Sequence, residues 1–150
     1  MSHNIIQQKS FAFAVRIVKL VRRLRTSLKG TVLSNQLLRA GAAIGAPVEE
    51  ALGEQSKKEC LGKLSIAEKE ARETQYRLRP LREAGVLSES EANDALREGQ
   101  HVLKMLTSLA LTTRHGLMSG SSPGTEPSSA AADSAPDAPH SSLIAKKRRS

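Results

Sequence analysis

The sequence is poor in aromatic residues and in cysteine. Its 150 residues include two Phe, one Tyr and no Trp, so Leu, Val, Ile and Ala must supply most of any core. Such a core suits helix-on-helix packing better than a sheet sandwich or a deep ligand pocket. The single cysteine, Cys60, cannot form an intramolecular disulfide, and we expect a small buried side chain in a reducing cytoplasm.

Long apolar runs are also absent. No segment approaches the roughly 18 to 20 apolar residues that a membrane-spanning helix requires. Residues 1–10 have neither the basic start nor the apolar centre of a signal peptide, so we expect a soluble protein with no membrane partner. A helix lying on a membrane surface is a weaker alternative, because the core already needs the apolar face of the first helix.

Acidic residues are missing from the first 48 positions, which contain eight Lys or Arg. The rest of the chain is close to neutral, so this segment carries the excess behind the net charge of +8. Cations gathered on one side of a molecule repel one another unless a partner neutralises them. The distribution therefore indicates contact with a polyanion.

The pattern that is present is helical. In four segments, apolar residues recur at alternating steps of three and four, which places them on one side of a helix. In the first segment this stripe consists of Ala14, Ile17, Val21, Leu24 and Leu28. The expected helices run from about Ser10 to Gly30, from Leu33 to Leu52, from Ser56 to Ala84 and from Ser88 to about Thr113. Their short connections predict an all-α fold, an antiparallel up-down four-helix bundle of residues 10–115.

Local signals mark the helix ends. Ser56 and Ser88 are each followed three residues later by Glu, which is the form of a capping box. Gly85 is placed to end the third helix, and Pro80 should loosen the last turn before it. Pro47 lies inside the second helix, where we expect a kink.

The two ends of the chain are expected to lie outside the bundle. Residues 1–9 would form an N-terminal arm. Residues 116–150 are rich in Ser, Ala and Pro, and this composition predicts a disordered tail because it cannot bury enough apolar surface to offset chain entropy. The tail ends in four basic residues, 146–149, which are a weak signal for a second electrostatic contact.

A recognisable family pattern lies in the segments QLLRAGAAIGAPVEEA (36–51) and KLSIAEKEARETQYRL (63–78). The chain resembles the four-helix-bundle proteins encoded in intervening sequences of bacterial 23S ribosomal RNA, which are related to accessory proteins of diversity-generating retroelements. The resemblance extends from about Gln8 to Thr113. The residues that carry it are Gln36, Arg39, Ala40, Ile44, Glu50, Ser56, Ile66, Ala67, Glu70, Ala71, Glu73, Thr74 and Tyr76.

The resemblance has implications for assembly and for partners. It implies a homopentamer with a central channel, and an accessory role in which the protein binds a reverse transcriptase and its RNA template. Relatives encoded in ribosomal RNA insertions have an obscure role, so this partner stays an expectation. The chain departs from the family at Pro47, where Asn is usual, and at Ala51, where Gly is common.

Four cations of the first helix form the best candidate site. At about 100° per residue, Arg16, Lys19 and Arg23 point away from the apolar stripe and Arg22 lies beside them. We call these four residues the basic ridge, and Lys29 extends the same positive surface. Contact with RNA or DNA phosphates is the functional interpretation, and a solvated helix face is the plain alternative.

The aromatic residues limit what such a site could recognise. All three lie near expected core positions, so no platform for stacking bases is predicted. Binding to nucleic acid should therefore be largely independent of base sequence.

Extra apolar residues on two helices predict contact between subunits. They are Phe11, Val15 and Val18 on the first helix and Val102, Met105 and Leu109 on the last. A helix that is apolar on two sides often packs against a second subunit, although a broad core-facing stripe would give the same pattern in the last helix. We therefore expect a homo-oligomer.

Two further groups of polar residues have structural interpretations. Arg39 and Glu50 are three turns apart and Glu73 lies on the helix that runs back beside them, which predicts a shared polar layer. Glu98 and His101 have the spacing of di-iron bundle ligands, but the second such pair is missing, so no metal site is expected.

The sequence thus favours a non-enzymatic, oligomeric protein that binds nucleic acid and needs no cofactor. No nucleophile with an adjacent His is visible, and a thin bundle offers no evident cleft. The alternative is a structural or partner-binding homo-oligomer in which the positive charge has no nucleic-acid role.

Overall fold

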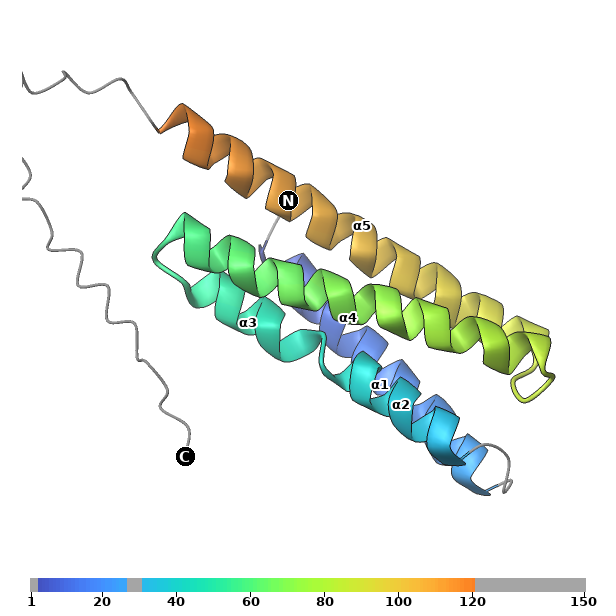
Figure 1. The fold of residues 1–150 in the computed structure, drawn as a ribbon. Helices are drawn as coiled ribbons and strands as arrows, with labels where there is room; N and C mark the ends of the chain where they lie inside the picture. The colour runs from blue at the N-terminus through green and yellow to red at the C-terminus, as the bar shows by residue number, and fades with distance from the viewer. Residues whose placement is uncertain (1–2, 27–30, 121–150) are drawn as a thin grey trace, which may run out of the picture.

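The computed structural model describes residues 3–26 and 31–120, and the regular structure of these residues is entirely helical. The helices are α1 (His3–Thr26), α2 (Thr31–Ala42), α3 (Gly45–Gly53), α4 (Lys57–Glu83) and α5 (Glu89–Ser119). Figure 1 shows that α2 and α3 follow one another along one line, so together they form one arm of the bundle. The predicted all-α fold of four packed antiparallel arms is confirmed for the described residues.

The arms are arranged in the cyclic order α1, α2–α3, α4 and α5. The first arm packs on α2, α3 and α5, and α4 packs on the same three helices. Because α1 and α4 share their neighbours, they lie diagonally across the bundle and their outer faces point in opposite directions.

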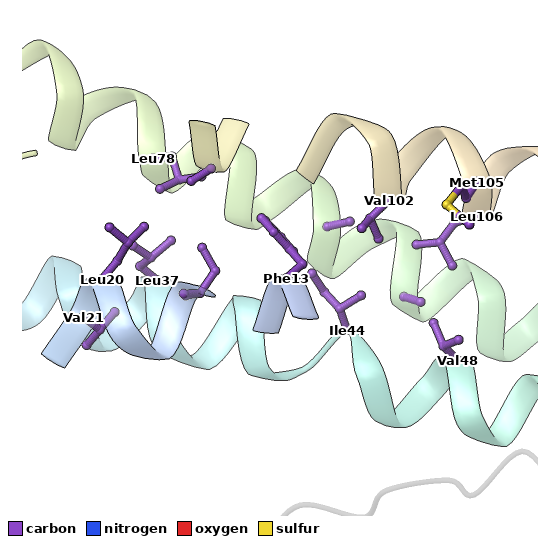
Figure 2. Packing of buried hydrophobic residues seen from close by; sticks show 14 of the residues in the cluster. Phe13, Leu20, Val21, Leu37, Ile44, Val48, Leu78, Val102, Met105 and Leu106 are labelled. Atoms are coloured by element: carbon purple, nitrogen blue, oxygen red, sulfur yellow. The ribbon is translucent and has the colours of Figure 1, made fainter. Parts of the chain in front are cut away.

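An aliphatic core fills the space between the arms. Phe13 of α1 is its one aromatic member and lies near Ile44, which joins α2 to α3 (Figure 2). Leu78 of α4 and Leu106 of α5 belong to the same core. All four side chains are completely buried. Cys60 lies at the edge of this core and is half-buried, and burial is the main reason that the pKa of its thiol is raised.

The predicted ends of the bundle need correction. Residues 3–9 belong to α1 and do not form a separate arm. Ile6 enters the core, and the hydroxyl of Ser10 donates to the Ile6 carbonyl (2.8 Å), so Ser10 lies inside the helix and does not cap it. At the other end, α5 continues to Ser119, whereas the bundle was predicted to end at residue 115. The rest of the predicted tail, residues 121–150, lies outside the described residues.

The second arm is broken where a kinked helix was expected. Pro47 is the third residue of α3, a position whose backbone N–H has no partner within a helix, so the missing donor costs little there. The same ring removes the hydrogen bond that would have joined the two helices into one. Ala40 and Ile44 before Pro47 and Val48 after it are nevertheless all buried, so the apolar stripe crosses the break.

The predicted serine caps of α4 and α5 and the glycine that ends α4 are confirmed. Ser56 Oγ accepts from the Glu59 amide (3.3 Å), and Ser88 Oγ accepts from the Glu91 amide (3.2 Å). Gly85 has φ of +69°, the left-handed conformation that glycine adopts without strain, and it reverses the chain after α4.

Two glycines allow α1 to lie very close to its neighbours. A Cβ on Gly41 of α2 would lie 2.7 Å from Cγ2 of Ile17, and one on Gly99 of α5 would lie 2.8 Å from Cζ of Phe13. Real side chains do not approach so closely, so a larger residue at either position would push α1 away.

We predict that Gly41→Ala lowers the free energy of unfolding by about 1–3 kcal/mol, the usual cost of overpacking a filled core. The loss should appear although Ala favours helix by about 1 kcal/mol over Gly. Gly62→Ala is the matched control, because a Cβ there would meet open space, and it should stabilise the protein. Equal effects of the two substitutions in chemical denaturation would contradict the close contact.

Candidate nucleic-acid interface

The outer face of α1 carries the basic ridge. Arg16, Lys19, Arg22 and Arg23 are all exposed. The buried residues of α1 follow one another at steps of three and four and so form one side of the helix, and the four cations lie on the other side. No acidic residue occurs in α1 itself. Lys29, which was predicted to extend this surface, lies outside the described residues.

Two members of the basic ridge are tied to α5. Arg16 pairs with Glu98, and Arg23 pairs with Glu91. Burial works to raise the pKa of Glu91, but hydrogen bonds from Arg23 and Ser88 outweigh it, so the pKa of this carboxyl is lowered. The pairs hold the two arginines over the α1–α5 boundary and neutralise part of their charge.

The other two members have no such partners. Lys19 and Arg22 form no ion pair with any carboxylate of the described residues. They therefore remain available to an external anion, and they lie one turn apart at the centre of the ridge.

Apolar side chains lie among these cations and not beside them. A shallow groove of about 980 Å³ runs along α1 and is lined by Phe11 and Val15 together with all four cations of the basic ridge and Glu98. Phe11 is 69% exposed. The predicted ridge and the predicted apolar line of α1 thus form a single mixed surface.

The predicted subunit contact on α5 needs correction. Val102 and Met105 are 1% and 6% exposed and belong to the core of the bundle, so they are not available to a second subunit. Leu109 is partly buried against the same core. On α1, Phe11 and Val18 are exposed and Val15 is half-buried, so the exposed part of the predicted set lies on the first helix.

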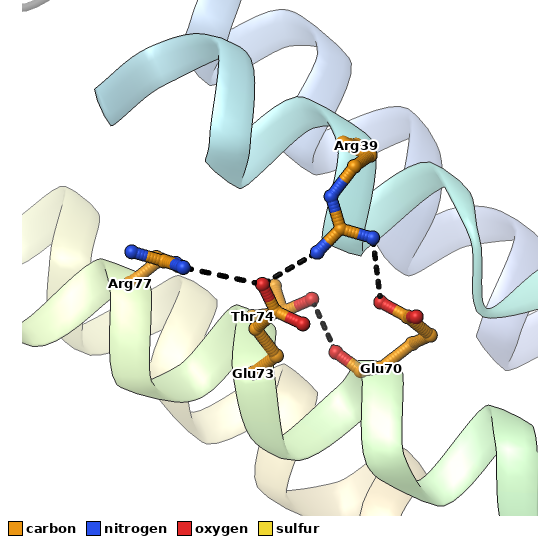
Figure 3. Close-up of polar contacts among 5 residues, drawn as sticks. All are labelled: Arg39, Glu70, Glu73, Thr74 and Arg77. Carbon is orange, nitrogen blue, oxygen red and sulfur yellow. Dashed lines mark hydrogen bonds and ion pairs between the residues drawn. The ribbon is translucent and has the colours of Figure 1, made fainter. Parts of the chain in front are cut away.

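The predicted polar layer is present with a different membership. Arg39 of α2 reaches two carboxylates of α4, Glu70 at 3.4 Å and Glu73 at 2.5 Å, and Glu73 also accepts from Arg77 (Figure 3). Glu50 takes no part, because it lies beyond the break on α3 and pairs with Lys63. The spacing argument that joined Arg39 to Glu50 assumed one continuous helix.

This polar layer joins α2 to α4, and we call its residues Arg39, Glu70, Glu73 and Thr74 the interhelical clasp. Glu70 is nearly buried, and Thr74 donates its hydroxyl to the Glu70 carbonyl one turn back (2.7 Å). The hydrogen bond from Arg39 is the main reason that the pKa of Glu73 is lowered, and its counterpart raises the pKa of Arg39. Arg39 contacts one oxygen of each carboxylate, so the clasp fixes the register of α2 against α4.

The Glu98–His101 pair is not assembled into a metal site. Glu98 points to Arg16, and His101 is exposed. Within residues 3–26 and 31–120, no three His, Cys, Asp or Glu side chains are grouped so that they could hold a metal ion.

The expectation that all three aromatic residues lie near the core is wrong for two of them. Phe13 is completely buried, whereas Phe11 and Tyr76 are 69% and 62% exposed. The periodicity of α4 contained the signal for Tyr76, because Ala71, Thr74 and Leu78 define a buried side on which it does not lie.

Comparison with known proteins identifies the family. The model of the 23S rRNA-intervening sequence protein family matches residues 2–108. The chain belongs to this family. Among curated proteins no match is found. The segments that suggested the 23S rRNA-intervening sequence family include Arg39, Glu70, Glu73 and Thr74, which form the interhelical clasp.

A solved structure supports the same assignment. The chain is similar to a protein of unknown function from the S23 ribosomal protein family of Bacteroides thetaiotaomicron, with 37% sequence identity and a TM-score of 0.68. The similarity covers 70% of this chain and 97% of that chain. None of the helices that the structure describes combines the length and apolarity needed to cross a bilayer.

We predict that acid weakens the fold in part through Glu73. Because its folded pKa lies below the unfolded value of about 4.3, the clasp stabilises the protein fully above that pH and is lost as the pH falls through the folded pKa. Glu73→Gln should therefore flatten the dependence of unfolding free energy on pH below about pH 5.

The matched control is the partner. Arg39→Gln should remove most of the same pH dependence of the unfolding free energy. The double variant should lose no more of this pH dependence than either single variant. Denaturant titrations at several pH values measure these slopes. An unchanged slope in Glu73→Gln would contradict the assignment.

Proposed function

We propose that this protein is a non-enzymatic nucleic-acid-binding protein that contacts the phosphate backbone of RNA or DNA through the outer face of α1. The observation that carries the proposal is the basic ridge, four exposed cations on a helix that contains no acid. Each phosphate that such a surface neutralises releases condensed counterions, which favours binding at low salt.

The ion pairs of the ridge suggest how much each of the four cations contributes to phosphate binding. Lys19 and Arg22 have no carboxylate partner among the described residues, so they are the first contacts for a phosphate. Arg16 and Arg23 must exchange Glu98 and Glu91 for phosphates, which makes their contribution smaller. Backbone contacts of this kind do not depend on base sequence.

A structural or partner-binding homo-oligomer is the second candidate function. The observation that favours it is the exposure of Phe11 and Val18 on the same face of α1. A homopentamer, and a reverse transcriptase as the partner, remain the expectations drawn from the family resemblance. Assembly would also place several copies of the basic ridge in one particle and strengthen its field.

We predict that the double variant Lys19→Gln/Arg22→Gln weakens binding to labelled duplex DNA and structured RNA. The salt dependence of binding should become less steep, by about one unit of slope for each lost phosphate contact. Mobility shifts over a salt series measure both effects.

The double variant Lys104→Gln/Arg114→Gln is the matched control. These exposed cations of α5 do not line the groove along α1, and their removal changes the net charge by the same amount. Glu98→Gln should act in the opposite direction and strengthen binding, because it releases Arg16. Equal losses in the two double variants would exclude a specific α1 site.

We predict that Phe11→Ser/Val18→Ser lowers the oligomer mass measured by light scattering if the α1 face joins subunits. Leu111→Ser is the control, because Leu111 is an exposed apolar residue of α5. A changed mass with unaltered nucleic-acid binding would favour the second candidate function.

A further inference from the structure

A second positively charged face lies on α4, on the opposite side of the bundle from the basic ridge. Its centre is Tyr76, which is 62% exposed and forms no hydrogen bond with any described residue. Lys69, Arg72 and Arg79 are exposed and lie seven and four residues before Tyr76 and three after it. These spacings place all four side chains along one side of the helix, and we call them the Tyr76 face.

The cations of the Tyr76 face are only weakly neutralised. Arg72 pairs with Glu68 at 3.4 Å, one turn away on the same helix. Lys69 and Arg79 have no carboxylate partner in the part of the chain that the structure describes. An exposed pair such as Arg72–Glu68 is held weakly, so all three cations can be offered to an anion.

A small hollow lies beside the tyrosine ring. Its volume is about 140 Å³, and it is lined by Tyr76, Arg72, Arg79, Gln75, Gln100 and Leu103. The amide of Gln75 donates to the side-chain oxygen of Gln100 (3.2 Å), and the amide nitrogen of Gln100 has no acceptor among the described residues. The hollow therefore combines an aromatic ring, an apolar wall and a hydrogen-bond donor.

This combination fits an unpaired base better than a folded protein surface. A base stacks on an aromatic ring and hydrogen-bonds at its edge, while its flanking phosphates need cations a few ångströms away along the strand. A duplex cannot use the hollow, because its bases are already stacked within the helix.

We propose that the Tyr76 face binds single-stranded nucleic acid, with one base stacked on Tyr76 and the adjacent phosphates neutralised by Lys69, Arg72 and Arg79. The inference rests on the proposed function for the class of ligand, but it concerns a different face and a different contact. The basic ridge holds the backbone, whereas the Tyr76 face distinguishes unpaired from paired strands.

The sequence supplies its own reporter for this contact. The chain contains one Tyr and no Trp, so the intrinsic fluorescence of the whole protein arises from Tyr76. A stacked base should quench this emission. The probe is a short unpaired oligoribonucleotide, and an abasic oligomer of the same length presents the phosphates without the bases.

We predict that the unpaired oligomer quenches the emission of Tyr76 and that the abasic oligomer and a duplex do not. Tyr76→Ala should weaken binding of the unpaired oligomer by about tenfold in a mobility shift, and Tyr76→Phe should retain the affinity because Phe also stacks. Ile66→Ala is the matched control, since it removes another exposed apolar side chain of α4 and should have no effect. Free tyrosine amide, titrated in parallel, corrects for absorption by the bases.

Two results would overturn the inference. Equal quenching by the abasic oligomer would show that no base stacks on the ring. A Tyr76→Ala variant with unchanged affinity and a smaller oligomer mass would show that the face contacts a second copy of the chain. The proposed function is tested separately, because Lys19→Gln/Arg22→Gln should weaken duplex binding and leave the quenching of Tyr76 by the unpaired oligomer in place.

Discussion

The rotation of α1 about its own axis is the constraint on which the rest of the structure depends. Two glycines set it, because Ile17 lies against Gly41 of α2 and Phe13 lies against Gly99 of α5. With these two side chains turned inward, the cations of the basic ridge have nowhere to lie except on the outer face. The surface that carries the proposed function is therefore positioned by contacts made deep inside the bundle.

Opposite faces of the bundle present cations in different settings. On α1 they line a shallow groove together with apolar side chains and are partly paired with α5, whereas on α4 they flank an exposed tyrosine and a small hollow. The clasp between Arg39 and the glutamates of α4 joins α2 to α4, and α2 packs in turn on α1. A rigid register between the arms keeps the two faces at a constant separation.

Periodicity and capping residues predicted most of the fold, including the starts of α4 and α5 at Ser56 and Ser88. The apolar stripe also predicted which side of α1 faces the core, since Ile17, Val21 and Leu24 are buried. It did not separate Phe13, which is buried, from Phe11, which is exposed, because both are equally apolar. Local pattern could not predict the partners of Arg39 either, because the helix break before Pro47 separates Arg39 from Glu50. The basic ridge needed only charge and helical spacing, but the exposure of Tyr76 was missed because an aromatic residue was assumed to be buried.

The pairing of Arg16 and Arg23 with glutamates has a consequence for selectivity. An isolated anion that approaches α1 gains the attraction of Lys19 and Arg22 but must compete with Glu98 and Glu91 for the other two cations. A polymer that already holds the centre of the ridge presents its next phosphates at high local concentration and can displace both carboxylates. Under the proposed function, the two glutamates would act as a threshold that favours long anionic chains over small phosphate compounds.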